Sequence, residues 1–158
     1  MSGDSHLVEN LDVLAEALWE RIRAIALAAH RLDRLPENAG GVAVIHEGEV
    51  EKLAEEFFLR LLRVGADPVN YALLSRIARE ASVPLAELAQ EVHLPALAVA
   101  ERVADLVQVG LAARSLIGDH VQATAATNAF IRLVQGAVGK LGRHIAEEWE
   151  TTVEGMRL

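Results

Sequence analysis

The chain has 158 residues, of which 52% are hydrophobic and only 4% aromatic, and it carries a formal net charge of -8. This length suits one domain with helical extensions. The negative charge argues against non-specific adhesion to nucleic acid or to an anionic membrane, and the few aromatic residues argue against a base-stacking platform. The absence of cysteine excludes disulfides and thiolate chemistry.

We expect a cytoplasmic protein. Residues 1–6 lack the basic segment that opens a secretory signal, and no apolar segment of the signal type follows them. No uncharged run approaches the ~18 residues that a membrane-spanning helix needs.

Residues 1–66 are predicted to form an N-terminal helical dimerisation region. Apolar residues recur at alternating three- and four-residue steps from Leu7 to Leu32, which indicates a long amphipathic helix that ends before Pro36. A second helix is predicted over residues 49–64. Whether residues 42–45 form a short strand stays open.

Residues 67–127 are predicted to form a winged helix-turn-helix domain. Its three helices follow from apolar side chains at helical spacing. They cover residues 69–81, 85–92 and 95–110. Pro95 is expected at the first position of the third helix, where its missing N–H would be unpaired anyway. Gly110 ends this helix as an unhindered left-handed residue.

A β-hairpin is predicted after these helices. Two strand-like runs, residues 111–117 and 121–125, flank the turn signal Gly118-Asp119. Helix, turn, helix, hairpin and a further helix is the element order of a winged helix. The expected fold class is therefore mostly α, with a winged helix-turn-helix, a small hairpin wing, and long N- and C-terminal dimerisation helices.

This order resembles the bacterial winged-helix regulators of the MarR/ArsR type. The resemblance covers residues 70–130 and rests on a few positions, namely Glu87-Leu88-Ala89, Leu94, Val99, Leu106, Gly110-Leu111 and Thr124. It implies a transcription regulator that binds DNA and dimerises through its terminal helices. It also implies a small apolar effector between those helices and the winged helix, here beside Trp19 and Phe57-Phe58. Close packing of the neighbouring alanines is the alternative that we favour at this place.

The second helix of the motif lacks the side chains that read DNA. Its early outward positions hold residues that cannot make a bidentate contact to guanine or adenine, namely Pro95, Ala96, Leu97, Ala98, Ala100 and Glu101. Residues 70–127 carry four arginines against six carboxylates, and this net negative charge opposes the counterion release that drives DNA binding.

Two interpretations of this surface stay open. The first is a regulator that binds DNA through a few basic side chains, for which the candidates are Arg76, Arg79, Arg102, Arg114 and His120. The second is a winged helix that binds another protein through an apolar patch, for which the candidates are Ala96, Leu97 and Ala100.

Residues 128–158 are predicted to form a long C-terminal helix with one apolar face. At about 1.5 Å per residue, this helix is too long for the winged helix to cover, so its exposed part needs a partner. We expect a second copy of the chain, because two-fold dimers are the commonest oligomers. A monomer whose long helices fold back on their own chain is the alternative. The candidate dimer interface comprises Leu11, Leu14, Leu18, Ile22, Ile25, Val134, Leu141, Ile145 and Trp149.

We expect neither an enzyme nor a bound cofactor or metal. His144 with Glu147 and Glu148 has the spacing of one helix face and could supply half of a zinc site across a dimer, but a solvated face is the favoured interpretation. Residues 136–141, GAVGKL, lack the spacer and the hydroxyl residue of a phosphate-binding loop.

Overall fold

A computed structural model describes residues 2–33, 47–80, 82–115 and 117–156. The described residues form six helices and three strands. In chain order these are α1 (Ser2–Asp33), α2 (Glu47–Gly65), α3 (Pro68–Glu80), β1 (Ser82–Pro84), α4 (Leu85–Glu91), α5 (Ala96–Gln108), β2 (Ala113–Ser115), β3 (His120–Gln122) and α6 (Ala125–Met156). The open question of a strand at residues 42–45 lies outside the described residues.

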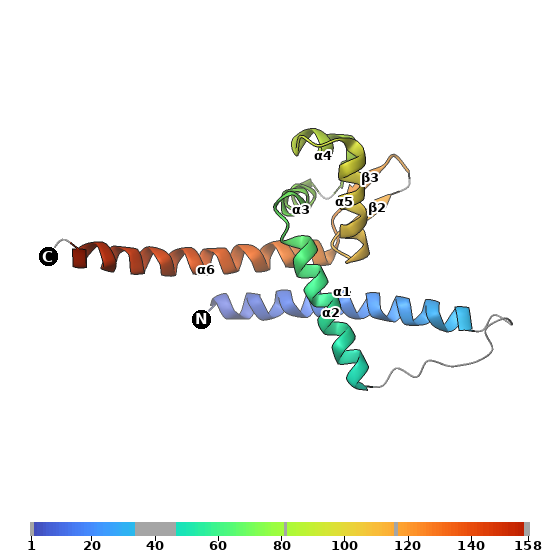
Figure 1. Cartoon of the computed structure of the whole chain (residues 1–158), viewed down its shortest axis with the longest axis horizontal. Helices are drawn as coiled ribbons and strands as arrows, with labels where there is room; N and C mark the ends of the chain where they lie inside the picture. The colour runs from blue at the N-terminus through green and yellow to red at the C-terminus, as the bar shows by residue number, and fades with distance from the viewer. Residues whose placement is uncertain (1, 34–46, 81, 116, 157–158) are drawn as a thin grey trace.

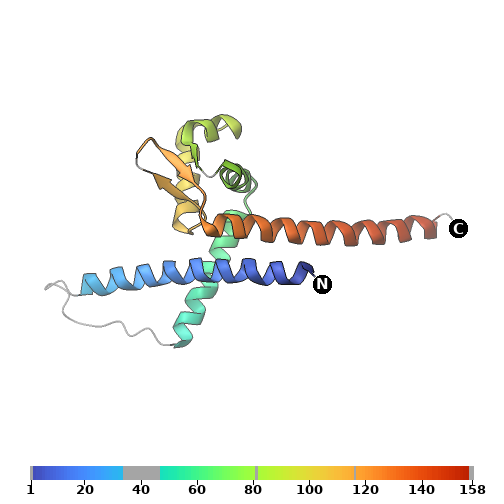
Figure 2. The same cartoon turned by 180° about the vertical axis from the view of Figure 1, so that it is seen from behind.

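Two long helices form the frame of the molecule. α1 and α6 run antiparallel and side by side, and α2 crosses them (Figures 1 and 2). They overlap over only part of their lengths, because the second half of α6 extends past the N-terminus of α1 (Figure 1). Residues 136–149 of α6 are all exposed. None of the described helices is both long and apolar enough to serve as a membrane span.

The remaining elements form a winged helix at the N-terminal end of α6. α3, α4 and α5 lie beside a three-stranded antiparallel sheet with strand order β1-β3-β2, in which Val83 and Arg114 both align with Val121. The order α3-β1-α4-α5-β2-β3-α6 confirms the predicted fold class.

The structure corrects the strands and the start of α5. β1 was not predicted, and β2 and β3 are shorter than the predicted runs. Pro95 precedes the helix, with a φ of -57° and an extended ψ of 142°, and the first helical residue is Ala96. Gly110 has a φ of 80°, which confirms the left-handed helix stop.

The core lies between the winged helix and the frame. Its largest fully buried side chains include Leu74, Ile77, Leu88, Val99, Leu106, Leu111 and Phe130. Gly65, at the end of α2, meets this core without a side chain. A Cβ at that position would lie 2.6 Å from Cζ of Phe130 and 2.9 Å from Cδ1 of Leu111. The absence of a side chain at Gly65 therefore lets α2 approach the start of α6.

Two threonines fix the start of α6 against the exit of α5. The backbone N–H of Thr124 donates to Oγ1 of Thr127 at 2.7 Å, and the N–H of Thr127 donates to Oγ1 of Thr124 at 3.1 Å. The Thr127 hydroxyl, which is fully buried, also donates to the carbonyl of Leu111 at 2.6 Å. This reciprocal cap satisfies N–H groups that an isolated helix start would leave unpaired.

Candidate functional site

The outward face of α5 carries no basic side chain. Leu97, Glu101, Ala104 and Gln108 follow one another at helical spacing and are all exposed, and the exposed fraction of Leu97 is 73%. The opposite face packs into the core through the fully buried Val99, Val103 and Leu106. Of the predicted apolar patch, Ala96 is exposed and Ala100 is half-buried. The wing adds Ile117, which is 89% exposed. The exposed face of α5 therefore presents apolar and acidic side chains to solvent.

Arg102, the one arginine of α5, lies toward the start of α3 and is held there. Its Nη1 donates to Oδ1 of Asp67 at 2.8 Å and to Oδ1 of Asn70 at 3.1 Å. Asp67 caps α3 through the same oxygen, which accepts the backbone N–H groups of Val69 and Asn70. The bond from the N–H of Asn70 lowers the pKa of the Asp67 carboxyl below its ordinary 3.8, and Arg102 lowers it further. Arg102 therefore has partners within the fold.

Arg76 is surrounded by three carboxylates. It pairs with Glu80 one turn further along α3, with Glu91 at 2.7 Å and with Glu87 at 3.8 Å. The hydrogen bond to Glu80 is the largest of the contributions that raise the pKa of the Arg76 guanidinium. Since Glu87 and Glu91 belong to α4, this cluster ties α3 to α4. Its net charge is negative.

The other predicted DNA contacts lie on α3 and on the wing. Nη2 of Arg79 lies 3.9 Å from Oε1 of Glu91, and the side chain of Arg79 is 70% exposed. On the wing, Nε and Nη2 of Arg114 lie 2.8 Å and 2.7 Å from Oδ1 of Asp119. His120 is half-buried in β3. Each of the four predicted arginines thus pairs with a carboxylate of the same chain.

The predicted dimer interface divides into covered and exposed positions. Leu14 and Ile22 are buried within the chain itself, and Leu18 and Val134 are half-buried. The side chain of Ile25 lies outside the described residues. The remaining members are exposed, from 38% at Leu11 to between 56% and 68% at Leu141, Ile145 and Trp149.

Three further exposed apolar residues belong with this surface, and of these only Val8 was missed from the sequence. Val138 continues the α6 stripe, and Val8 and Trp19 share a face of α1 with Leu11. The helical spacing of Val8, Leu11 and Trp19 is visible in the sequence, so this second face of α1 could have been recognised from it. The spacing does not show which of the two faces meets α6.

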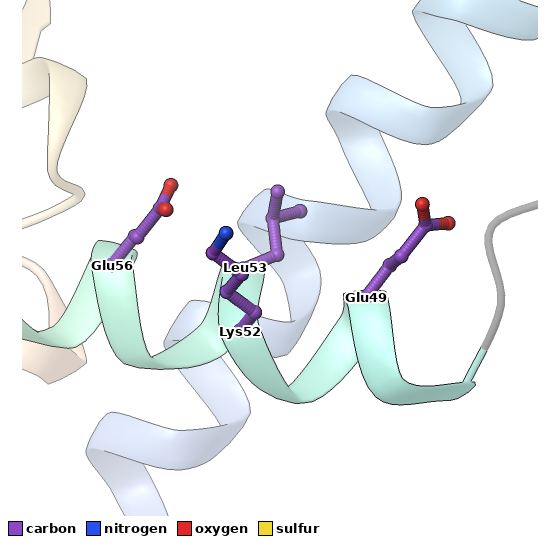
Figure 3. Close-up of a pocket in the computed structure, with 4 residues that line it drawn as sticks. All are labelled: Glu49, Lys52, Leu53 and Glu56. Carbon is purple, nitrogen blue, oxygen red and sulfur yellow. The ribbon is translucent and has the colours of Figure 1, made fainter.

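The cavities along α2 have charged walls. One cavity of about 340 Å³ is lined by Glu49, Lys52, Leu53 and Glu56, with only Leu53 apolar among them (Figure 3). A smaller one, of about 120 Å³, is lined by Glu56, Phe57 and Arg60. Trp19 is half exposed, with 51% of its surface accessible. The apolar effector beside Trp19 stays a prediction.

His144, Glu147 and Glu148 all lie on the exposed part of α6. Among the residues that the structure describes, His, Cys, Asp and Glu side chains do not gather in threes as metal ligands would.

No model of a known protein family matches the chain. No curated protein matches its sequence either. Among solved structures, the chain is similar to the X-ray crystal structure of the YusO protein from Bacillus subtilis, with 17% sequence identity and a TM-score of 0.45. The match covers 68% of this chain and 86% of that one.

Proposed function

We propose that this protein is a homodimer whose winged helix binds another protein rather than DNA. The observation that carries the proposal is the pairing of Arg76, Arg79, Arg102 and Arg114 with carboxylates of the same chain. DNA affinity rests largely on the release of counterions from the DNA when cationic side chains neutralise its phosphates. An arginine already paired with a carboxylate releases few counterions, and the displaced carboxylate stays near the phosphate.

The energy of these ion pairs alone does not prevent the arginines from binding DNA phosphates. Exposed pairs contribute only about 0–1 kcal/mol each, so a phosphate could compete for the guanidinium groups. The excess of acidic groups remains after such a competition, because residues 70–127 hold six carboxylates and four arginines. Glu101 and Asp105 stand exposed along α5, the helix that would enter a DNA groove. Acidic groups at these positions repel the backbone whichever partner the arginines have.

The same surface suits a protein partner. Leu97 projects from the first turn of α5, beside the exposed Ala96, and the acidic Glu101 follows one turn later. A partner with an apolar anchor for Leu97 and a basic side chain for Glu101 would complement this face. Interfaces combine such an apolar centre with a polar rim.

Removing the carboxylates that mask the arginines tests this proposal. In the triple variant Glu87→Gln, Glu91→Gln, Asp119→Asn, the guanidinium groups of Arg79 and Arg114 lose their acidic partners, and Arg76 keeps only Glu80. We expect its affinity for random-sequence duplex DNA at low salt to rise by about tenfold or more over the wild type. Fluorescence anisotropy of labelled DNA measures the change.

A matched control separates masking from net charge. Asp12→Asn, Glu51→Gln, Glu55→Gln removes the same three charges from exposed positions on α1 and α2. We expect this control to bind DNA as weakly as the wild type. Equal gains in both variants would mean that only the total charge matters, and an unchanged triple variant would remove the masking argument.

Arg79 favours the second candidate function, which is DNA binding through a few arginines. Its side chain is 70% exposed, and at 3.9 Å its contact with Glu91 is the longest of the arginine–carboxylate contacts on this domain. If the protein binds DNA, Arg79→Ala is expected to weaken binding equally for all sequences and to lower the salt slope by about one. Titrations of two unrelated duplexes at several salt concentrations measure both quantities, and an unchanged slope excludes Arg79 as a phosphate contact.

The dimer is proposed from the exposed apolar faces of the two long helices. On α6 this face comprises Val138, Leu141, Ile145 and Trp149, and on α1 it comprises Val8, Leu11 and Trp19. The two faces do not cover each other within the chain, since all of these side chains are exposed. Part of α6 extends past the N-terminus of α1 (Figures 1 and 2). A two-fold dimer would place the α6 face of each copy against the other copy, and Leu14 and Ile22 would remain in the core of each chain.

A further inference from the structure

A polar junction joins the end of α2 to both α3 and α5. Asn70, at its centre, is 5% exposed. Its Nδ2 donates to the carbonyl of Val64 at 2.9 Å, and its Oδ1 accepts Nη1 of Arg102 at 3.1 Å. Asp67 accepts the same Nη1 at 2.8 Å while it caps α3. A single guanidinium on α5 is therefore bound to the turn that connects α2 with α3.

The other main attachment of α5 is apolar. Val99, Val103 and Leu106 are fully buried and hold the helix against the core. Apolar burial is strong but non-directional, so it resists removal of α5 more than it resists a small rotation or slide. Hydrogen bonds weaken steeply when their angles change. The bonds of Arg102 to Asp67 and Asn70 therefore constrain the orientation of α5 more narrowly than the apolar contacts do.

The junction also reaches the frame of the molecule. Val64 and Gly65 close α2, and Gly65 lies against Phe130 of α6 with no room for a side chain. A displacement of α2 along α6 would thus move the carbonyl of Val64. Asn70, which binds both this carbonyl and Arg102, would transmit the movement to α5. The apolar contacts of α5 provide no comparable directional connection to α2. One exposed hydrogen bond, from Nη2 of Arg60 on α2 to Oε1 of Gln108 on α5 at 2.7 Å, is a second directional connection, at the far end of α5.

We infer that Asp67, Asn70 and Arg102 form a latch that fixes the orientation of α5, and of the surface it presents, relative to the α1–α2–α6 frame. Arg102 is on this account a positioning residue and not a contact to DNA or to a partner. The latch does not depend on the proposed function, because it sets the orientation of α5 whether that helix meets protein or DNA.

The chain has no cysteine, so spin labels can be placed at chosen sites to test the latch. One pair, Ala104→Cys on α5 and Ala137→Cys on α6, reports the orientation of α5, and a second pair, Glu16→Cys on α1 and Ala137→Cys, reports the frame. All three positions are exposed. Distances are measured by double electron–electron resonance in samples diluted with unlabelled protein, so that the labels of one chain dominate.

We expect Arg102→Met, which keeps an apolar stem without the donors, to broaden or shift the distance between α5 and α6 while the frame distance stays unchanged. Asp67→Asn keeps an oxygen to cap α3 but removes the charge, and it should shift the same distance by less. Arg102→Lys keeps the charge but not the fork of donors, so its distance between α5 and α6 should return only in part to the wild-type value.

Two outcomes would overturn the latch. Unchanged α5–α6 distances in Arg102→Met would mean that the apolar core and the bond of Arg60 to Gln108 set the orientation without Arg102. Broadening of both label pairs to the same degree would mean that Arg102 supports the whole fold and not the position of α5. If Arg102→Met does not fold, the milder Asp67→Asn variant decides between these outcomes with the same two label pairs.

Discussion

Replacing Leu141 and Ile145 with aspartate is expected to convert the proposed dimer into a monomer. Both side chains lie on the exposed apolar face of α6, with 58% and 56% of their surfaces accessible in the single chain. Full burial of a leucine or isoleucine stabilises by about 1.5–3 kcal/mol. In a two-fold dimer both copies carry the substitutions, so each side chain is lost from the interface twice. The dissociation constant of the dimer should therefore rise by about a thousandfold or more. Sedimentation equilibrium over a range of concentrations measures it.

The matched control places two aspartates on another face of the same helix. Gly136 and Gly139 are exposed, and an added Cβ has open space at Gly136 and meets only the end of Arg143 at Gly139. Gly136→Asp, Gly139→Asp therefore adds the same charge as Leu141→Asp, Ile145→Asp and should leave the dimer intact. A wild type that is monomeric at all concentrations, or a dimer that survives Leu141→Asp, Ile145→Asp, contradicts the proposed interface.

Gly65→Ala is expected to destabilise the fold. The added Cβ would lie 2.6 Å from Cζ of Phe130 and 2.9 Å from Cδ1 of Leu111, and both side chains are fully buried. Overpacking of this kind costs about 1–3 kcal/mol. At about 2–4 °C per kcal/mol for a chain of this size, a loss of about 2 kcal/mol lowers Tm by about 4–8 °C. Thermal unfolding followed by circular dichroism measures the shift.

Gly136→Ala provides the control for Gly65→Ala. It also replaces a helical glycine with alanine, but no atom lies within 4 Å of the added Cβ. We expect a gain of about 0.5–1 kcal/mol from the lower conformational freedom of alanine in the unfolded chain. If Gly65→Ala is as stable as Gly136→Ala, then α2 and α6 do not approach as closely as the structure shows.

Periodicity predicted the helices well because each of them buries one face. The predicted ranges 49–64 and 69–81 lie within two residues of α2 and α3 at each end. The start of α6 was placed three residues late, at 128 instead of Ala125, because the apolar stripe begins inside the helix. The cap that sets the boundary is formed by Thr124 and Thr127, whose hydroxyls bind each other's N–H.

β1 could not be predicted from local pattern. It has three residues, Ser82–Pro84, which are too few to show alternation, and its hydrogen-bonding partner β3 begins at His120. The pairing depends on tertiary structure, which brings the two segments together. The predicted hairpin strands were too long for a related reason, since apolar residues of the flanking segments, such as Leu111, belong to the core and not to the sheet.

The candidate site shows the same limit more clearly. The pair of Arg76 with Glu80 spans one helical turn and is readable from the sequence. The bond of Arg102 to Asp67 spans 35 residues and depends on the packing of α5 against α3. Likewise, the repeat of apolar residues along α1 did not reveal that Leu14 is buried and Leu11 exposed. Composition predicted an acidic domain, but only the structure shows that its arginines are paired.

The affinity of the wild-type protein for random-sequence duplex DNA tests most directly whether this winged helix lacks DNA binding, as we propose. Non-specific binding requires no knowledge of an operator, and it is strongest at low salt. Fluorescence anisotropy of a labelled duplex, titrated at low salt and again at higher salt, measures it. We predict no saturable binding at either salt concentration. Tight binding at low salt that falls steeply with added salt would contradict the account and would show that the few arginines suffice.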